Sequence, residues 1–212
     1  MFKCTTKRYD KLYSRWLRSP GDLLDLGGYD PAKDRLLDLC GGTGAVALEA
    51  VRRGAAARVA LVDLNPRCVH PRIQPFKADV CRQRLEVGLF DLCVIRQAVG
   101  YLDMHAVASS LSGTMPPGSR LVFNTFRNPR WRATVYRDQG RSYLELSGHF
   151  GSRVVHAQVS PSVGVDISAF RYQGEEELLT DMCPWFLVRR IERTTRSARY
   201  LMIRTDFDWS AS

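Results

Sequence analysis

The chain has 212 residues, of which 45% are hydrophobic and 25% are charged, and its formal net charge is +9. This length is enough for one domain with a sizeable core, and the composition is ordinary for a folded protein. No apolar run approaches the ~20 residues that a membrane span requires, and the N-terminus lacks the apolar segment of a secretory signal, so we expect a cytoplasmic protein with no membrane partner.

The six cysteines are scattered along the chain and form no C-x-x-C pair. A zinc site or a redox motif therefore has little support, and we expect no metal. Reduced cysteine in an apolar segment acts as a small hydrophobe, and thiols stay reduced in the cytoplasm. We therefore expect free thiols.

The first predicted element is an amphipathic helix. Apolar and aromatic side chains recur at helical spacing at Tyr9, Leu12, Tyr13, Trp16 and Leu17. The segment 19–21, Ser-Pro-Gly, ends this helix, because proline and glycine interrupt the periodic pattern. We expect Asp22 to cap a second short helix, which ends at Gly27-Gly28.

Short apolar runs and helical patterns then alternate up to residue 126. We expect strands at 35–40, 58–65, 73–80, 89–99 and 119–126. A glycine turn leads from the first strand into a helix with Ala45, Leu48 and Val51 along one face, and a second helix is expected at 104–115. This alternation predicts a parallel sheet with helices on both faces.

The pattern changes after residue 126. Four β-like segments separated by Gly, Ser and Pro lie between residues 131 and 173, and they predict three or four antiparallel strands that form a flap. A helix is expected at 174–183, and a closing hairpin is expected around residues 194–197.

The stretch "LLDLCGGTG" at 36–44 joins a strand to a helix through three glycines. Such a turn lets a ligand approach the bare backbone, and the free amides at the start of the helix point toward it. Asp63 ends the second strand 21 residues after Gly42, where an acid suits the two hydroxyls of an adenosine ribose. Because "GTGAVA" at 42–47 also satisfies the G-x-G-x-x-A pattern, the glycines alone leave NAD and FAD open.

Three further features favour a different cofactor. Asp38 precedes the glycines, where its carboxylate would repel a pyrophosphate but would suit a cofactor that carries an ammonium and a sulfonium. Asp79 follows the third strand, where an adenine amino group could find an acceptor, with Val80 against the ring. The segment "RQAVGY" ends the fourth strand at the ligand-binding carboxyl edge of the sheet, beside the first strand.

On the stretches "LLDLCGGTG", "LVDLNP", "KADV" and "FDLCVIRQAVGYL", the chain resembles the class I S-adenosylmethionine-dependent methyltransferases. The resemblance covers about residues 34–126 and extends more loosely to 174–206. It implies an α/β fold: a seven-stranded, mostly parallel Rossmann-like sheet with one antiparallel strand, helices on both faces and an antiparallel β-flap inserted after the fifth strand. It also implies S-adenosylmethionine as the cofactor.

The resemblance assigns roles to individual residues. Asp38 would face the methionine amino group, Asp63 would hold both ribose hydroxyls, Leu64 would pack on adenine, and Asp79 would accept from the adenine amino group. The remaining implied contacts, from the glycine turn and from the backbone after the fourth strand, are Cys40, Gly41, Gly42, Gly44, Val80, Arg96 and Gln97.

The segment "YDKLYSRW" also resembles the N-terminal helix with which small-molecule methyltransferases close over the cofactor. Tyr9 and Tyr13 are candidates to touch the cofactor, while Tyr13 and Trp16 are equally well explained as core anchors of that helix. We therefore expect a single methyltransferase domain over 1–212, with a helical lid at 1–33, a cofactor-binding core at 34–126, the β-flap at 127–173 and a terminal helix and hairpin at 174–212.

The resemblance does not settle the methyl acceptor, because methyl transfer is a direct displacement that needs alignment more than a particular catalytic set. Residues 96–99 lack the Asn/Asp-Pro-Pro-Tyr/Phe turn of adenine and glutamine methyltransferases, and no separate RNA-binding domain is evident. We expect a small-molecule acceptor, such as an anionic metabolite or a natural-product intermediate. The acceptor-side candidates are Tyr101, His149 and Tyr172. Further candidates are Gln97, Asn124, Tyr136 and His156.

Two alternatives stay open. The net charge of +9 and the arginine-rich tail would suit an RNA or protein methyltransferase, so nucleic acid is a less favoured partner. A non-catalytic regulatory protein that binds the cofactor is the other alternative. The sequence gives no indication of the oligomeric state.

Overall fold

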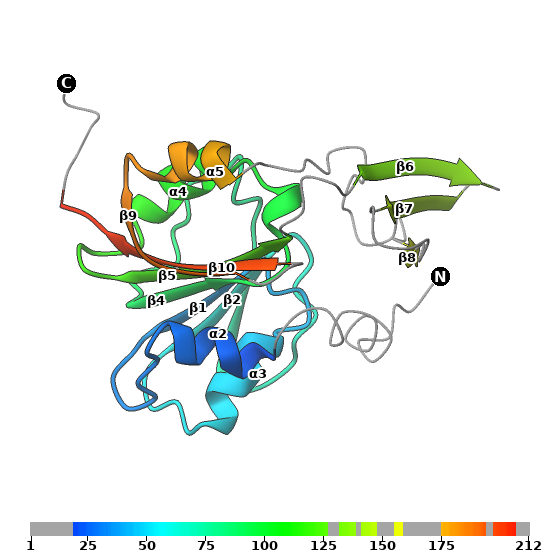
Figure 1. Cartoon of the computed structure of the whole chain (residues 1–212). Coiled ribbons are helices and arrows are strands. Elements are labelled where there is room, and N and C mark those ends of the chain that lie inside the picture. Colours follow the sequence, from blue (N-terminus) through cyan, green and yellow to red (C-terminus); the bar gives the residue numbers. More distant parts are fainter. Residues whose placement is uncertain are drawn as a thin grey trace.

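The computed structural model describes residues 19–126, 132–138, 141–147, 155–158, 175–193 and 197–206. Its main sheet has seven strands in the order β3-β2-β1-β4-β5-β10-β9 (Figure 1). In chain order these strands are β1 (Leu36–Leu39), β2 (Val59–Asp63), β3 (Ile73–Lys77), β4 (Leu92–Ile95), β5 (Arg120–Phe126), β9 (Phe186–Arg193) and β10 (Ser197–Arg204).

β10 is the one strand of this sheet that runs opposite to the other six. It pairs antiparallel with both β5 and β9, whereas β1, β2, β3, β4 and β5 pair in parallel. The predicted seven-stranded, mostly parallel sheet with one antiparallel strand is therefore confirmed.

Helices cover both faces of this sheet, as predicted (Figure 1). One face carries α2 (Pro20–Leu26) and α3 (Ala45–Arg52), and the other carries α4 (Met104–Ser112) and α5 (Glu175–Met182). A short 3-10 helix, η1 (Val99–Tyr101), connects β4 to α4.

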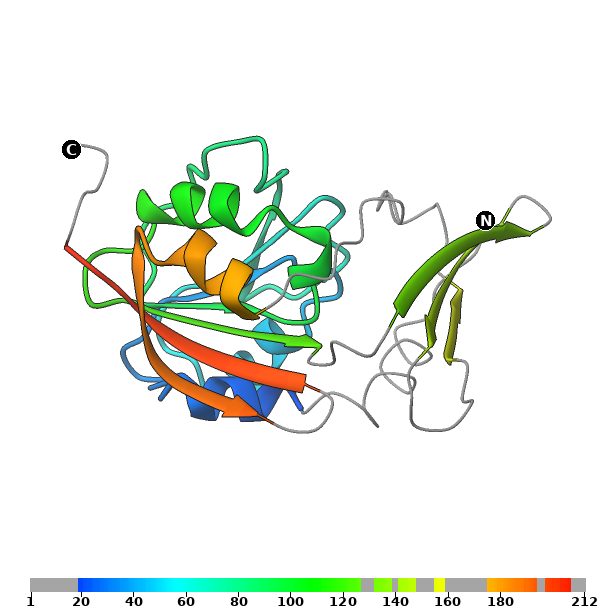
Figure 2. The ribbon, with the colours of Figure 1, turned by 45° about the horizontal axis from the view of Figure 1, so that its top comes forward.

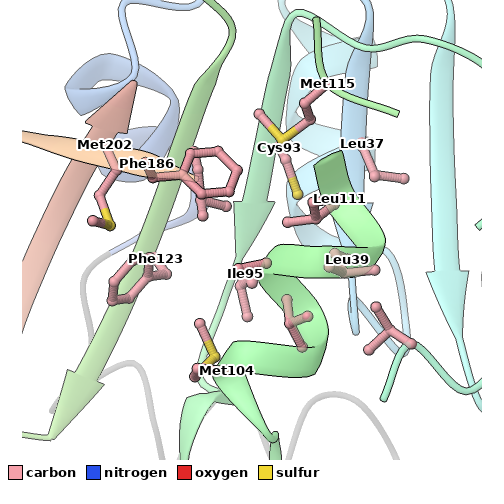
Figure 3. Close-up of a cluster of buried hydrophobic side chains, with 14 of the residues drawn as sticks. Leu37, Leu39, Cys93, Ile95, Met104, Leu111, Met115, Phe123, Phe186 and Met202 are labelled. Carbon is pink, nitrogen blue, oxygen red and sulfur yellow. The ribbon is translucent and has the colours of Figure 1, made fainter. Parts of the chain in front are cut away.

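The central strands are buried on both faces, which explains their near-continuous apolar sequence. Leu37, Leu39 and Ile95 pack with Met104 and Leu111 of α4 in the cluster drawn in Figure 3. Leu36 belongs to the cluster on the opposite face, with α2 and α3. Since side chains alternate along a strand, Asp38 shares the α3 face with Leu36.

The start of α2 differs from the prediction. Ser19 is the N-cap residue, because its hydroxyl accepts from the backbone N–H of Asp22 at 3.3 Å, and Pro20 occupies the first turn. Asp22 therefore lies in the first turn instead of capping the helix. Proline suits this position because its missing N–H would have no partner within the helix.

The buried face of α3 also differs from the prediction. Its buried residues are Val46, Ala47 and Ala50, whereas Leu48 is 41% exposed. In such an alanine-rich helix, two stripes are apolar enough to be buried. Packing against the sheet selects the stripe that is buried, and the Ala47 backbone N–H that donates to Asp38 lies on this side.

A second sheet follows β5, as predicted for the antiparallel flap. Its strands are β6 (Arg132–Asp138), β7 (Arg141–Ser147) and β8 (Val155–Gln158), and they pair antiparallel in the order β6-β7-β8. The expected strand segment at 165–173 lies outside the described residues. The second sheet lies on the side to which β5 points (Figure 2).

None of the helices in the described part of the chain is long and apolar enough to cross a membrane. The five described cysteines, Cys40, Cys68, Cys81, Cys93 and Cys183, are free thiols, as predicted for them.

Candidate active site

The candidate site lies at the carboxyl edge of the parallel strands. The strand order runs outward from β1 to β2 and β3 in one direction, and from β4 to β5 in the other. This reversal between β1 and β4 is the position at which open α/β sheets bind ligands. The glycine turn after β1 and the segment after β4 both lie there.

The turn after β1 depends on backbone conformations that glycine adopts readily. Gly42 and Gly44 have φ values of 52° and 75°, in the left-handed region, and Cys40 shares this region at 56°. A Cβ atom on Gly44 would also lie 2.8 Å from the Cβ of Cys68. The turn therefore needs glycine at position 44 for both its dihedral angles and its packing.

Gly41 has a different function, because it lies against the carboxylate of Asp38. A Cβ atom on Gly41 would lie 2.6 Å from Oδ2 of Asp38. Two atoms at this distance overlap sterically, so any residue larger than glycine at position 41 would displace the Asp38 carboxylate. The first glycine of the turn thus makes room for the acid that precedes it.

Asp38 is a fully buried acid with one unused oxygen. Its exposed fraction is 0%, and its Oδ2 accepts from the backbone N–H of Ala47 in α3 at 3.0 Å. Its Oδ1 has no hydrogen-bond partner among the described residues. Burial raises the pKa of Asp38 to about 7, while the Ala47 hydrogen bond and the charge of Arg96 oppose the rise.

An orphaned, buried carboxylate oxygen is costly unless a ligand completes it. The deprotonated group would favour a cation or a strong hydrogen-bond donor at Oδ1. The amino group of a methionine moiety meets both requirements, so this part of the site fits the ligand that the resemblance implied.

Asp63 ends β2 and is bonded to the glycine turn. Its Oδ2 accepts from the backbone N–H of Gly42 at 2.9 Å, and its Oδ1 accepts from the N–H of Asn65 at 2.8 Å. Each carboxylate oxygen has a further lone pair, so the held group can still accept from a diol. Leu64 follows it and is 42% exposed, as a residue that packs on a ligand ring would be.

Asp79 and Val80 lie beyond β3, which ends at Lys77, earlier than the predicted strand end at 80. Oδ1 of Asp79 accepts from the N–H of Cys81 at 3.1 Å, and its Oδ2 lies 3.6 Å from Nε of Arg82. Val80 is only 4% exposed and belongs to the core. The Asp79 carboxylate therefore stabilises its own turn.

The thiol of Cys40 is affected by the charges of all three acids. Burial is the main cause that raises the pKa of its thiol well above the usual value, and the charges of Asp63, Asp38 and Asp79 add to the rise. These three carboxylates act on one side chain, so the fold brings together residues from the ends of three strands. The sequence placed Cys40 in the site only as part of the turn.

The segment after β4 carries a second strained residue. The strand ends at Ile95, before the predicted end at 99, and Gln97 has a φ of 63°. The backbone N–H of Gln97 donates to Oδ1 of Asn124 in β5 at 3.1 Å. Arg96 lies close enough for its charge to lower the pKa of Asp38.

Two features of the site were not expected from the sequence. One is the bond from Ala47 to Asp38, and the other is the packing of Cys68 against Gly44. The hydrogen bond to Asp38 could have been predicted, because an acid just before a glycine turn and a helix start can accept from the first backbone N–H groups of the helix. The second had no signal, because Cys68 lies in a loop whose path depends on tertiary packing.

Several predicted residues stay untested. Tyr9, Tyr13, His149 and Tyr172 lie outside the described residues, and the description of Tyr101 does not extend to its side chain. Among the residues that the structure describes, no group of three or more His, Cys, Asp or Glu residues could hold a metal ion.

Comparison with known proteins identifies the family to which the chain belongs. The family model described as a methyltransferase domain matches residues 8–158. A search of curated protein sequences found no match.

Solved structures with similar folds include several methyltransferases. The CcbJ methyltransferase from Streptomyces caelestis superimposes with a TM-score of 0.60 at 14% identity, over 92% of this chain and 95% of that one. Geranyl diphosphate C-methyltransferase from Streptomyces coelicolor A3(2), solved with S-adenosyl-L-homocysteine, gives a TM-score of 0.61 at 16% identity over 88% and 75%. The glycopeptide N-methyltransferase MtfA, complexed with sinefungin, gives 0.58 at 12% identity over 87% and 92%.

The identities to these structures are low, so they establish the fold alone, whereas the family match extends over more than half of the chain. The chain belongs to the methyltransferase-domain family and has the class I fold of S-adenosylmethionine-dependent methyltransferases.

Proposed function

We propose that this methyltransferase binds S-adenosylmethionine at the glycine turn and transfers its methyl group to a small-molecule acceptor. The observation that carries the proposal is Asp38, a fully buried acid beside the glycine turn with Oδ1 unpaired among the described residues. A cationic ligand satisfies this group, and a phosphate does not.

The backbone amides of the turn support the same choice. A dinucleotide pyrophosphate binds to free N–H groups at the start of the helix. Here the N–H of Ala47 donates to Asp38, that of Gly42 donates to Asp63, and that of Gly44 donates to the carbonyl of Gly41 at 2.8 Å. The chain's own groups therefore use three of the amides that could otherwise bind a pyrophosphate here.

Residues around the turn would hold different parts of the cofactor. Asp38 would accept from the methionine amino group, with the backbone of Arg96 and Gln97 beside it. Asp63 would accept from the ribose hydroxyls, and Leu64 and Asp79 would meet the adenine. When bound, S-adenosylmethionine supplies an electrophilic methyl group on a sulfonium. The protein contributes alignment and exclusion of water, which a direct displacement needs most.

A small-molecule acceptor is favoured over RNA for two reasons. The second sheet, β6–β8, follows β5 on the side to which the parallel strands point, where it would cover the acceptor (Figure 2). In addition, three arginines in the described part of the tail form ion pairs: Arg190 and Arg199 pair with Glu192, and Arg193 pairs with Glu175. Ion-paired arginines attract a polyanion less strongly, so the excess positive charge of the chain is weak support for nucleic acid.

The other sequence predictions are part of the same proposal. The segment 1–33 would close over the cofactor, the segment 127–173 would enclose the acceptor, and the protein would act in the cytoplasm. An anionic metabolite or a natural-product intermediate would be the acceptor.

Isothermal titration with S-adenosylmethionine and with NAD in parallel tests the cofactor. We expect heat of binding for S-adenosylmethionine and none for NAD, and a micromolar NAD complex without S-adenosylmethionine binding would contradict the proposal. A screen of metabolite fractions with radiolabelled methyl donor then tests the acceptor. Binding of the donor with no conversion to the demethylated product in any fraction would favour the regulatory alternative.

A further inference from the structure

Gln97 carries two energetic costs that a purely structural residue would avoid. Its φ of 63° lies in the left-handed region, where a residue other than glycine is strained. Its side-chain Nε2 and Oε1 are both buried and have no hydrogen-bond partner among the described residues. A buried amide without partners pays the full cost of its desolvation.

Both costs would be lower with another residue at this position. Glycine would remove the strain, and leucine would remove the unpaired polar atoms while keeping similar bulk. Departures of this kind from local rules are concentrated at functional sites in natural proteins. The Gln97 side chain therefore has the properties of a group that a ligand completes.

Asn124 holds the Gln97 backbone in this conformation. It lies in β5, is 5% exposed, and its Oδ1 accepts from the Gln97 N–H at 3.1 Å. Ile95, two residues before Gln97, pairs directly across the two strands with Phe123, the residue before Asn124. Asn124 thus fixes the direction of the chain as it leaves β4.

The topology places Gln97 on the acceptor side of the site. The ribose acid Asp63 ends β2, on one side of β1, whereas Gln97 is bonded to β5, on the other side. If the adenosine lies toward β2, the methyl end of the cofactor lies toward β4 and β5. The second sheet, which follows β5, lies on the same side (Figure 2).

We propose that the carboxamide of Gln97 binds the methyl acceptor at a neutral N–H or O–H group, and that Asn124 is the residue that positions it. A carboxamide offers one acceptor oxygen and two donor hydrogens and carries no charge. It suits an uncharged amine, an alcohol or a phenol, and it does not compensate a carboxylate or a thiolate. This inference rests on the proposed function and specifies the reactive group of the acceptor.

Gln97 binds and orients the acceptor in this proposal and does not act as a base, because an amide does not take up a proton near neutral pH. The lone pair of the acceptor nitrogen or oxygen forms the new bond to the methyl carbon as the sulfur–methyl bond breaks. The donor would leave as neutral S-adenosylhomocysteine, and the proton of the methylated N–H or O–H group would pass to water. In a buried site without an opposite charge, desolvation favours the uncharged amine over its ammonium form, whereas a carboxylate at the same position would favour the ammonium.

The variant Gln97→Leu tests the proposal through stability and transfer together. If the amide waits for a ligand, the variant without ligand should melt about 2–6 °C higher than the wild type, because the unsatisfied group is gone. Its affinity for S-adenosylmethionine, measured by titration, should stay within about threefold. Methyl transfer to the neutral acceptors of a defined panel should fall at least about tenfold.

The acceptor panel consists of weakly basic amines that are uncharged at the assay pH, alcohols and phenols, with matched carboxylic acids and thiols. Radiolabelled S-adenosylmethionine reports transfer to each. We expect wild-type transfer only within the neutral set. Transfer confined to acids or thiols, or no transfer to any neutral compound, would overturn the proposal.

Gln74→Leu is the matched control. Gln74 is an exposed glutamine of β3, and its Oε1 already accepts from Arg58 at 2.6 Å and 3.0 Å. It is not among the residues assigned to the site. Its replacement should not raise the melting temperature and should leave transfer unchanged. Gln97→Asn is a second variant, since asparagine tolerates a left-handed φ and keeps an amide one carbon shorter. It should fold normally and transfer more slowly than the wild type.

Asn124 needs its own test as a positioning residue. Asn124→Ala removes the acceptor for the Gln97 N–H and should lower transfer at least about tenfold, with Asn124→Asp restoring part of it because an oxygen acceptor remains. Equal loss in both variants would overturn the positioning role.

The remaining outcomes separate this inference from the proposed function. A lower melting temperature for Gln97→Leu would mean that the amide stabilises the fold, and a loss of S-adenosylmethionine affinity beyond about tenfold would mean that it binds the cofactor. Either result overturns the inference and leaves the proposed function standing. A wild-type protein that binds no S-adenosylmethionine would instead refute the proposed function.

Discussion

The backbone N–H of Gly42 donates to Oδ2 of Asp63 at 2.9 Å, so the glycine turn after β1 and the acid that ends β2 are joined directly. The N–H of Asn65 holds the other oxygen of the same carboxylate at 2.8 Å. The chain therefore orients the acid by its own backbone. Such preorganisation lowers the cost of binding, because the group does not need to be ordered by the ligand.

Replacement of Asp63 by alanine should weaken S-adenosylmethionine binding by about 1–3 kcal/mol, the usual cost of losing hydrogen bonds to a charged group. Titration calorimetry measures the change. Asp206→Ala is a control, because Asp206 is an exposed acid after β10 and should leave the affinity unaltered. If the affinity of Asp63→Ala equals that of the wild type, the assignment of this acid to the ribose is wrong.

Replacement of Gly41 by alanine should disable the site through Asp38. The new Cβ would lie 2.6 Å from Oδ2 of Asp38, so the buried carboxylate must move. We expect at least about a tenfold loss of S-adenosylmethionine affinity, or about 1.4 kcal/mol, with a lower melting temperature.

The matched control for that variant is Gly113→Ala at the end of α4. The added Cβ would lie 3.3 Å from the flexible end of Arg84, which can move away. Stability and affinity should stay near the wild-type values. Wild-type binding by Gly41→Ala would show that Asp38 does not need its present position.

The stability of the ligand-free protein should depend on pH through Asp38. Its pKa is raised from 3.8 to about 7 in the folded protein, chiefly by burial. Between these values the folded state keeps a proton that the unfolded state has released. The contribution of this group to the free energy of unfolding therefore falls as the pH rises through that range, by up to about 1.4 kcal/mol per pH unit, and is constant above it.

Urea denaturation of the wild type and of Asp38→Asn between pH 4 and pH 8 measures this contribution as a difference, because all other groups titrate in both proteins. The stability of the wild type relative to the variant should decline as the pH rises. A constant difference across the range would show that burial does not shift this carboxyl as described.

The affinity for S-adenosylmethionine should change with pH in the opposite sense. Binding of an ammonium group requires the ionised form of Asp38, so the affinity should rise as the pH increases toward and through 7. Titrations in two buffers with different ionisation enthalpies should detect proton release on binding near pH 6. A pH-independent affinity, with no proton release, would show that Asp38 does not bind the amino group of S-adenosylmethionine.

Replacement of Arg120 by alanine should lower stability without changing the site. Arg120 Nη2 pairs with Oδ1 of Asp34 at 2.6 Å, and Nη1 donates to the carbonyls of Gly27 and Gly28 at 2.8 Å and 2.7 Å. Asp34 is 8% exposed, so removal of its partner leaves a nearly buried charge. We expect a loss of about 2–3 kcal/mol in urea denaturation with unchanged S-adenosylmethionine affinity. A weaker affinity would mean that this cluster extends to the cofactor site.

The order of strands and helices could be predicted because each element has a local pattern. The run at 36–39 is apolar apart from Asp38, the glycines after it need special dihedral angles, and polar residues separate the β-like sequences of β9 and β10. Errors arose where two patterns were compatible with the same residues. The helix α3 buries Val46, Ala47 and Ala50 instead of the predicted stripe, because contact with the sheet selects the face.

Part of the chemistry of the candidate site could also be predicted from the sequence. Asp38 lies one residue before the end of β1, Asp63 ends β2 and Asp79 follows β3. Parallel strands bring their carboxyl ends to one edge. These three positions are determined by local sequence and by a general rule of α/β sheets. Their hydrogen-bond partners are not determined in this way, since the partners come from other segments.

The sequence by itself therefore determined the sheet, the glycine turn and the three acids of this methyltransferase, because periodicity and backbone preference act between near neighbours in the chain. Only the tertiary structure decided that Oδ1 of Asp38 has no partner among the described residues, that Gly42 holds Asp63, and that Asn124 holds a strained Gln97. Burial and hydrogen bonding across 21 or 27 positions depend on how the segments pack, and no local pattern records them.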